Sequence, residues 1–316
     1  MSRYGPLLVL VAALFALWYA AAVPMNIREA LSAAERNGVV VEPATAIERR
    51  DANALGLVAV NPAQIPAAWA QDRPRLPAPH QIVGELWQSV VMEEIEGRRG
   101  LLKSGSLSNR GLLLHAWITL SATALGFVIG TVAGVLLAVG IVHSRTMERS
   151  VMPWAIVSQT VPIVALAPMI VVVLYSVGLQ GLLPKAIISA YLSFFPVVVG
   201  MVKGLRAPDA MQTDLMRTWD ASGWQVLTRL RLPASMPYLF ASLKVGIAAA
   251  LVGTIVGELP TGAIRGLGAR MLSGSYYGQT VQIWSALFAA AILAAILVGI
   301  ISVIQRRTLT GMGMNA

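Results

Sequence analysis

The side chains of this sequence that could carry chemistry are few and widely separated. The three histidines, His80, His115 and His143, have no second ligand at the spacing that a metal site needs, and the chain has no cysteine. No Ser-His-Asp or carboxylate-pair arrangement stands out, and the sequence has no G-x-x-x-x-G-K-S/T phosphate loop. We therefore expect no metal site, no bound cofactor and no enzyme activity within this chain.

Glu258 is the acidic residue that lies closest to a long apolar run. It follows residues 237–257 directly and precedes a glycine-rich segment. An ionisable group at membrane depth is costly and is therefore a functional candidate, although water near the end of a span lowers that cost. Two interpretations stay open: a gate or binding-protein contact, and a solvated cap of the loop.

Two prolines interrupt another apolar run, at Pro162 and Pro168. A proline inside a span frees backbone carbonyls and bends the helix, which is tolerated where neighbouring helices or a water-filled cavity satisfy those groups. The two prolines therefore predict either a bent transport path or a kink that serves packing alone.

Of the 316 residues, 56% are hydrophobic and only 12% are charged, whereas roughly a quarter of the residues of a soluble domain are charged. This composition indicates a membrane protein, so membrane helices must position the residues above. A span needs roughly 20 apolar residues. Six runs are long enough: 5–23, 112–142, 151–177, 182–202, 237–257 and 281–304. We interpret the first as a retained helix rather than a signal peptide. The sequence predicts an all-α fold, a polytopic membrane bundle of about six transmembrane helices.

The distribution of the net charge of +9 along the chain indicates how the chain is oriented in the membrane. Residues 24–110 carry ten basic and ten acidic side chains, so the positive excess lies in short loops at the ends of the spans. By the positive-inside rule these loops and both termini are cytoplasmic. No aromatic-basic interleaving is present, which argues against nucleic-acid binding.

These boundaries divide the chain into four parts. They are an N-terminal transmembrane helix (1–23), an external insertion with an interfacial helix (24–110), a transmembrane domain (111–307) with a cytoplasmic loop at 205–236, and a cytoplasmic tail (308–316). Helices are expected at 26–36 and 81–96 of the insertion. Its clustered prolines favour a loosely ordered segment over an independent domain.

Small residues at intervals of four mark the second apolar run. Gly126, Gly130 and Gly134 would share one face of a helix. In lipid, helix association is not driven by the hydrophobic effect and depends on close packing. Rows of small residues allow that packing, because they let two helix backbones approach each other. We expect a helix-packing face here.

An amphipathic, basic segment separates two apolar runs at residues 205–236. Met211, Leu215 and Trp219 share a face at steps of four. Asp220 suits the N-cap of a second helix that Pro233 would end. Its apolar positions are Ala221, Trp224, Leu227 and Leu230. Such a pair of helices could rest on lipid headgroups or dock into a groove on a partner.

The stretch DLMRTWDASGWQVLTRLRLP resembles the EAA loop of the membrane permease subunits of bacterial ABC importers. In that pattern Asp214, Leu215 and Met216 fall on the E-A-A positions and Asp220 on the glycine, while Leu230 to Pro233 fall on I-x-L-P. Leu-Met in place of Ala-Ala departs from the pattern, and so does Asp220, with Gly223 three residues later.

The resemblance implies a type I importer fold and a coupling helix that docks on an ATP-binding subunit, which holds ATP and Mg. It further implies a periplasmic or lipid-anchored substrate-binding protein, a second permease copy (homodimer or heterodimer) and a place in the bacterial inner membrane. The residues implied in docking are Asp214, Leu215, Met216, Trp219, Asp220, Ala221, Gly223, Trp224, Leu227, Leu230 and Pro233.

Further motifs indicate a group within this family. HAWITLSATALGF at 115–127 resembles the H-x-x-x-S-L-x-R-x-x-x-G-F motif of sulfonate, taurine and nitrate permeases, with Thr119 for Ser and Ala122 for Arg. SFFPVVVGMVKGLR, and the GLG at 266–268, look closest to permeases for pyrimidine precursors of thiamine and similar heterocycles. The resemblance covers residues 76–307 and implies import of a small solute of one of these classes.

Two rival functions remain at this point. A secondary transporter would need ion-coupling carboxylates near the midplane, and the spans are almost free of acidic residues. A membrane scaffold would fit the packing glycines but would leave the docking loop unexplained.

Overall fold

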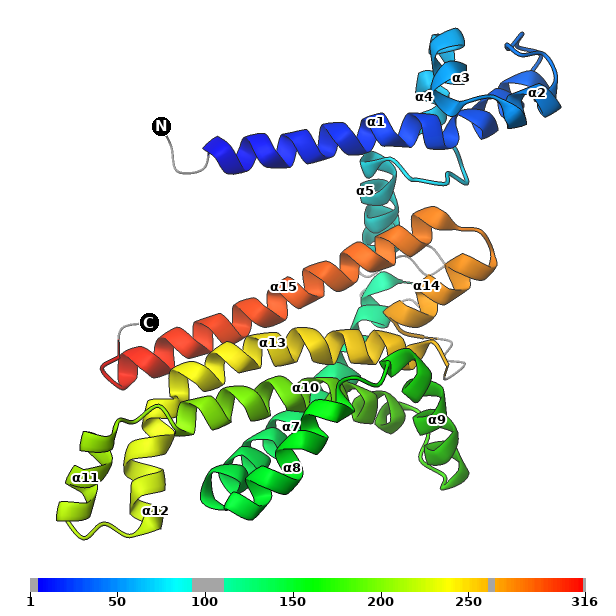
Figure 1. The fold of residues 1–316 in the computed structure, drawn as a ribbon. Helices are drawn as coiled ribbons and strands as arrows, with labels where there is room; N and C mark the ends of the chain where they lie inside the picture. Colours follow the sequence, from blue (N-terminus) through cyan, green and yellow to red (C-terminus); the bar gives the residue numbers. More distant parts are fainter. Residues whose placement is uncertain (1–4, 93–110, 261–264, 315–316) are drawn as a thin grey trace. The chain divides into compact units, whose positions relative to one another are not determined.

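The computed structural model describes residues 5–92, 111–260 and 265–314, and every regular element within them is helical (Figure 1). The all-α prediction is confirmed. The α-helices are α1 Gly5–Arg36, α2 Ala46–Asp51, α3 Ala54–Val60, α4 Ile65–Trp69, α5 Pro79–Trp87, α7 Leu112–His143, α8 Arg145–Ser158, α9 Ile163–Ser176, α10 Leu182–Leu205, α11 Ala210–Thr218, α12 Gly223–Val226, α13 Leu232–Glu258, α14 Leu267–Tyr276 and α15 Thr280–Gly311. A 3-10 turn (Pro62–Gln64) and two π-helical turns (Gln88–Met92 and Leu227–Arg231) complete the set.

Five helices in the described ranges are long and apolar enough to cross a membrane: α1, α7, α10, α15 and the continuous helix Gly223–Glu258 that contains α13. The third predicted run is instead two helices, α8 and α9, bent by 102°. Pro162 is the N-cap of α9, at the break, whereas Pro168 lies inside α9. The prediction of about six spans agrees with the structure if this bent pair forms one broken span.

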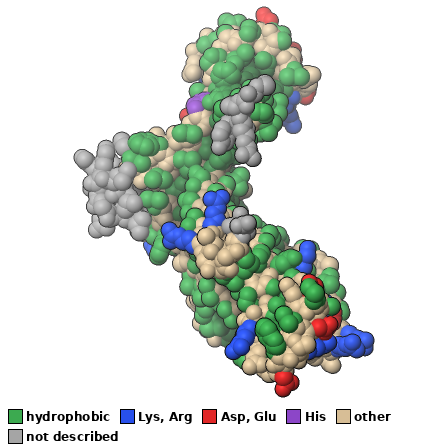
Figure 2. Space-filling view, turned by 90° about the vertical axis from the view of Figure 1, so that its left-hand side faces the viewer, with side chains coloured by type: hydrophobic (Ala, Val, Ile, Leu, Met, Phe, Trp, Pro, Cys, Tyr) green, Lys and Arg blue, Asp and Glu red, His purple; other side chains and the backbone are tan. Residues whose placement is uncertain are grey.

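The chain divides into two compact units. The first comprises residues 1–113 and 270–288, and the second comprises residues 114–269 and 289–316. Hydrophobic side chains cover much of the surface visible in Figure 2, as expected where lipid is the solvent.

In the first unit, α1 runs without interruption through Pro24 into the insertion. The helix expected at 26–36 is therefore the second half of α1. Its face carrying Ile27 and Leu31 is fully buried against Val41 and Leu57 of the following segment. Of the helix expected at 81–96, residues 79–92 form α5 and a π turn, and the remainder lies outside the described residues.

Polar side chains hold the insertion on α1. Asn26 is fully buried, donates to the carbonyls of Ala68 and Leu76, and accepts from the backbone N–H groups of Arg75 and Leu76. The buried Arg49 pairs with Glu35 of α1. The expectation of a loosely ordered segment is wrong for residues 37–92, because buried polar contacts at this density fix one arrangement.

In the second unit, the glycine row of α7 packs against α10. A Cβ at Gly134 would lie 2.8 Å from the carbonyl oxygen of Phe194, and one at Gly126 or Gly130 would overlap Ser189 or Ser193. The expected packing face is confirmed. Gly253 of α13 approaches α10 in the same way, at 2.9 Å from the Cα of Ser189, so small residues bring α7, α10 and α13 close together.

Candidate functional site

The loop between α10 and α13 forms two short helices, as predicted. Asp209 caps α11, where its carboxylate accepts from the backbone N–H of Gln212 at 2.7 Å. Ser222 caps α12 and accepts from the backbone N–H of Gln225 at 3.3 Å. The prediction that Asp220 is the second N-cap is therefore wrong by two residues.

Asp220 instead closes the first helix. Its φ is +50°, and it is the single non-glycine residue with positive φ in the described part of the chain. Its N–H donates to the carbonyl of Arg217 at 2.9 Å, and the N–H of Ala221 donates to that of Met216 at 3.1 Å. These are the two bonds of a Schellman motif, whose left-handed residue is usually glycine and sometimes Asn or Asp. Asp220 thus takes a left-handed backbone conformation that glycine adopts more readily.

Several large apolar side chains of this loop are exposed. Trp219 and Trp224 flank the turn and are each 71% exposed, and Met211 and Leu215 of α11 are 77% and 52% exposed. Asp214 pairs with Arg217 at 2.9 Å on the same helix. Ala221 lies in the turn between the helices, and Gly223 is the first residue of α12, where an added Cβ would meet nothing within 4 Å.

The end of the loop belongs to the core. Leu227 is buried among α7 and α10 side chains such as Ile141 and Met201, and Leu230 is half-buried. We therefore reassign Leu227 from docking to packing. The prediction that Pro233 ends the helix is wrong. A π turn lies just before Pro233, and in it the N–H of Leu232 donates to the carbonyl of Leu227. The helix therefore continues through the proline, with a bend between α12 and α13 at this turn (Figure 1).

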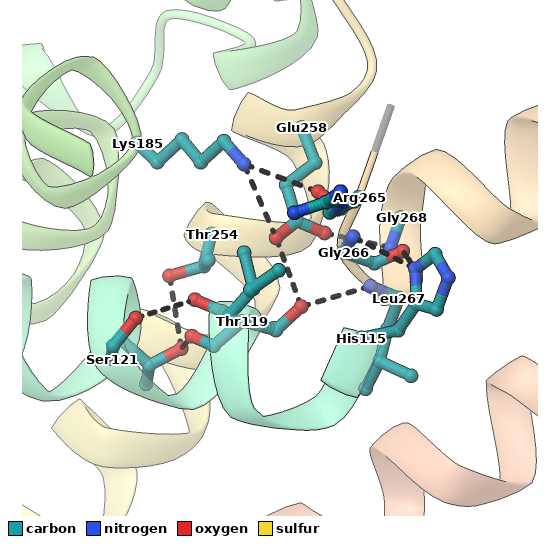
Figure 3. Close-up of polar contacts among 12 residues, drawn as sticks. His115, Thr119, Ser121, Lys185, Thr254, Glu258, Arg265, Gly266, Leu267 and Gly268 are labelled. Carbon is teal, nitrogen blue, oxygen red and sulfur yellow. Dashed lines mark hydrogen bonds and ion pairs between the residues drawn. The ribbon is translucent and has the colours of Figure 1, made fainter. Parts of the chain in front are cut away.

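A buried polar cluster occupies the other end of α13, around Glu258 (Figure 3). One carboxylate oxygen accepts from Thr119 Oγ1 at 2.9 Å, and the other accepts from the backbone N–H of Gly268 at 2.7 Å. Lys185 Nζ of α10 lies 3.8 Å from the carboxylate. Glu258 is fully buried and Lys185 nearly so. Hydrogen bonds hold the carboxylate and the ammonium group supplies its counter-charge.

The segment 266–268 closes over this cluster. The Thr119 hydroxyl accepts from the N–H of Leu267 at 2.9 Å, and His115 Nδ1 lies 2.9 Å from both the nitrogen and the oxygen of Gly266. Gly266 has φ +132°, and a Cβ there would overlap the Glu258 carboxyl group. The glycine is required because the backbone crosses directly over the carboxylate.

The structure unites residues that the sequence singled out separately. His115 and Thr119, one turn apart on α7, meet Glu258 and the GLG segment. The interpretation of Glu258 as a solvated cap is wrong, since its side chain is fully buried. Pro162, the N-cap of α9, and Pro168, within α9, are exposed and take no part in the cluster.

The sequence reasoning missed the role of Lys185. A signal was available, because a lysine in an apolar run requires a partner, but the 72 residues that separate it from Glu258 hide the pairing. Thr123 and Thr254, whose hydroxyls lie 3.0 Å apart beneath the cluster, gave no signal. Among the described residues, no group of three His, Cys, Asp or Glu side chains could hold a metal ion.

Comparison with known proteins gives a family and several relatives. Residues 130–310 match the model of the family described as binding-protein-dependent transport system inner membrane component. A probable ABC transporter permease protein of Haemophilus influenzae is 30% identical over 55% of this chain and 69% of its own length. The riboflavin transport system permease protein RibX of Chloroflexus aurantiacus is 28% identical over 73% and 78%. The formylaminopyrimidine transport permease protein ThiX of Halalkalibacterium halodurans is 31% identical over 53% and 65%.

Proposed function

Since this chain belongs to the family of binding-protein-dependent transport system inner membrane components, we propose how its parts share the work of an importer. The chain is the permease subunit of an ABC importer and crosses the inner membrane several times. We assign ATP, Mg²⁺ and hydrolysis to a separate ATP-binding subunit, because the sequence has no phosphate loop. The permease binds no cofactor of its own in this proposal.

The exposed tryptophan pair of the loop between α10 and α13 carries the docking assignment. Two tryptophans at 71% exposure in a water-facing loop are costly unless a partner covers them, and such anchors dominate interface energies. We assign the contact to Asp214, Leu215, Met216, Trp219, Asp220, Ala221, Gly223 and Trp224, with Leu230 and Pro233 holding the loop on α13.

Co-purification tests this assignment. The ATP-binding subunit should be lost from the complex with Trp224→Asp or Gly223→Asp, because each places a charge in the interface. Trp87→Asp, at a tryptophan that is also exposed but lies in α5, is the matched control and should retain the subunit. Retention with both loop variants would refute the docking role.

We place the docking loop and both termini in the cytoplasm. The basic residues in the loops at 143–149 and 203–231 support this orientation. The chain has no cysteine, so single cysteines introduced at Ser222 and at Arg73 can be labelled from one side at a time. Labelling of Ser222→Cys from the external side would show that the docking loop is external and would contradict the proposed orientation.

The remaining partners are a second permease copy and a periplasmic or lipid-anchored substrate-binding protein. The first agrees with the exposed apolar face of α9, where Met169, Val172 and Val173 are uncovered. A homodimer is the simple case and a heterodimer the variant, and mass measurement of the purified complex separates them.

For the transported solute we propose a small nitrogen heterocycle. The two relatives above whose names state a solute are named for riboflavin and formylaminopyrimidine. Calorimetric binding of these two compounds, with taurine and nitrate as comparators, to the cognate substrate-binding protein tests the class. Binding of taurine or nitrate alone would move the assignment to the sulfonate and nitrate group.

For the transport path we propose the break at Pro162 as one wall and the Glu258 cluster as the closure of its external end. The 102° bend directs α9 away from α8, and the cluster ties α7, α10 and α13 together. Pro162→Ala should straighten the pair and lower uptake severalfold while the ATP-binding subunit still co-purifies. Unchanged uptake would remove Pro162 from the path.

A further inference from the structure

The first unit contains a concave site of about 740 Å³ between the insertion and the stretch from α14 to the first turn of α15. The insertion contributes Asp72, Arg73 and Glu85, and the opposite wall includes Arg270, Tyr277 and Gln282. Arg270 lies 3.5 Å from Glu85, so an ion pair joins the two walls. Neither wall alone would form the site.

Both walls lie on the side of the membrane opposite the docking loop. The docking loop precedes α13 and the α14 segment follows it, so one crossing separates them. The insertion follows α1, whose Trp18 packs on Trp284 and Phe288 at the start of α15, with ring centroids 5.1 and 5.7 Å apart. Contact between the outer part of α1 and the first turns of α15 is what a shared external side requires.

The lining of the site favours a polypeptide over a small solute. It combines both charge signs with amide and hydroxyl groups, and Val281 is its one aliphatic side chain. Pockets for small molecules are lined mostly by apolar and aromatic groups. Tyr277 at the rim is 71% exposed, and tyrosine and arginine are the residue types enriched in protein interfaces.

We propose that this concavity, called here the external socket, receives a polar loop of the substrate-binding protein. The insertion supplies one wall of that docking surface, so it contributes to recognition of the delivery partner. The proposal rests on the proposed function, because an importer of this kind needs a binding protein. The Asn26 hydrogen bonds and the Arg49–Glu35 pair fix the insertion wall before the partner arrives, which lowers the entropy lost on docking.

Titration of the binding protein tests the external socket. The complete transporter is reconstituted in nanodiscs, and ATP hydrolysis is measured against the concentration of the purified substrate-binding protein encoded with this permease. Arg73→Glu and Tyr277→Ala should each raise the half-maximal concentration about tenfold. Arg50→Glu, the same charge change at an exposed insertion residue outside the lining, should leave it unchanged.

Cross-linking gives a second readout that does not depend on activity. With no native cysteine, Arg73→Cys and Tyr277→Cys carry single reactive sites, and each should cross-link to the binding protein. Arg50→Cys should not. Half-maximal concentrations within twofold of the unmodified chain, or equal cross-linking at all three positions, would overturn the proposal.

Failure of the proposed function would look different. If the ATP-binding subunit does not co-purify with the unmodified chain, the importer assignment itself is wrong. If it co-purifies and the binding protein stimulates hydrolysis equally in the socket variants, the importer assignment stands and the external socket is rejected.

Discussion

The two ends of the continuous helix that contains α13 present opposite surfaces. At the Gly223 end, the large apolar side chains of Trp219 and Trp224 are exposed beside it. At the Glu258 end, the charged side chains of Glu258 and Lys185 are buried. Each arrangement is costly in isolation, because apolar surface belongs away from water and charge belongs in it.

The two ends differ in how the exposed apolar side chains and the buried charges are stabilised. At the buried end, hydrogen bonds from Thr119 and Gly268 satisfy the carboxylate within the chain, so this end is complete by itself. At the exposed end, nothing in the described part of the chain covers the two tryptophans, and the proposed function assigns their cover to the ATP-binding subunit. The first end is satisfied within the chain, whereas we propose that a partner subunit completes the second.

Glu258→Leu is the strongest test of the buried end. It leaves the ammonium group of Lys185 without its counter-charge, so the unfolding free energy should fall by about 3–5 kcal/mol. Unfolding in SDS-containing mixed micelles measures this. The double variant Glu258→Leu, Lys185→Met should recover most of the loss, and a double variant as unstable as the single one would show that the ion pair is not the cause.

Trp224→Ala tests the exposed end. It should weaken binding of the ATP-binding subunit by about 2 kcal/mol or more, roughly 30-fold, with little change in the unfolding of the isolated permease. Titration of the subunit onto permease nanodiscs gives the affinity, with Trp87→Ala as the control. A fall in permease stability without a change in affinity would erase the contrast between the two ends.

Gly266→Ala sharpens the account of the cluster. The added Cβ would overlap the Glu258 carboxyl group in a left-handed backbone, and we expect a loss of about 1–3 kcal/mol in the same unfolding assay. Gly299→Ala is the matched control, because a Cβ at Gly299 meets nothing within 4 Å. Equal effects of the two changes would mean that the backbone does not cross over the carboxylate.

Substitution of Asp220, in the turn at the exposed end, should have the smallest effect on stability. Asp220→Val should cost about 1–2 kcal/mol, because a β-branched residue resists a φ of +50°, whereas Asp220→Gly should change stability by less than about 1 kcal/mol. Helix content by circular dichroism and the unfolding assay detect both. A tolerated valine would show that the Schellman turn is dispensable.

Most spans could be predicted from the sequence, because only a helix satisfies every backbone group in lipid and a helix needs a run of fixed length. The loop helices followed from the spacing of Met211, Leu215 and Trp219. Their junction did not. Asp is both a good N-cap and a tolerated left-handed residue, and local sequence alone does not choose between these roles for Asp220.

The cluster at Glu258 illustrates the limit of local patterns. His115, Thr119 and the GLG segment could each be singled out, but their meeting depends on how α7, α10 and α13 pack. The insertion was misjudged for a related reason. Its prolines predicted a loosely ordered segment, whereas its order comes from Asn26 and Glu35 on a helix whose first apolar run ends before Pro24.

The unbroken course of α1 has a mechanical consequence. Its 32 residues at 1.5 Å each form a rod of about 48 Å, which exceeds the hydrocarbon thickness of about 30 Å by more than half of that thickness. The excess carries the insertion. Because the helix is continuous, we expect a force applied to the insertion to tilt the membrane-spanning part of α1 as well.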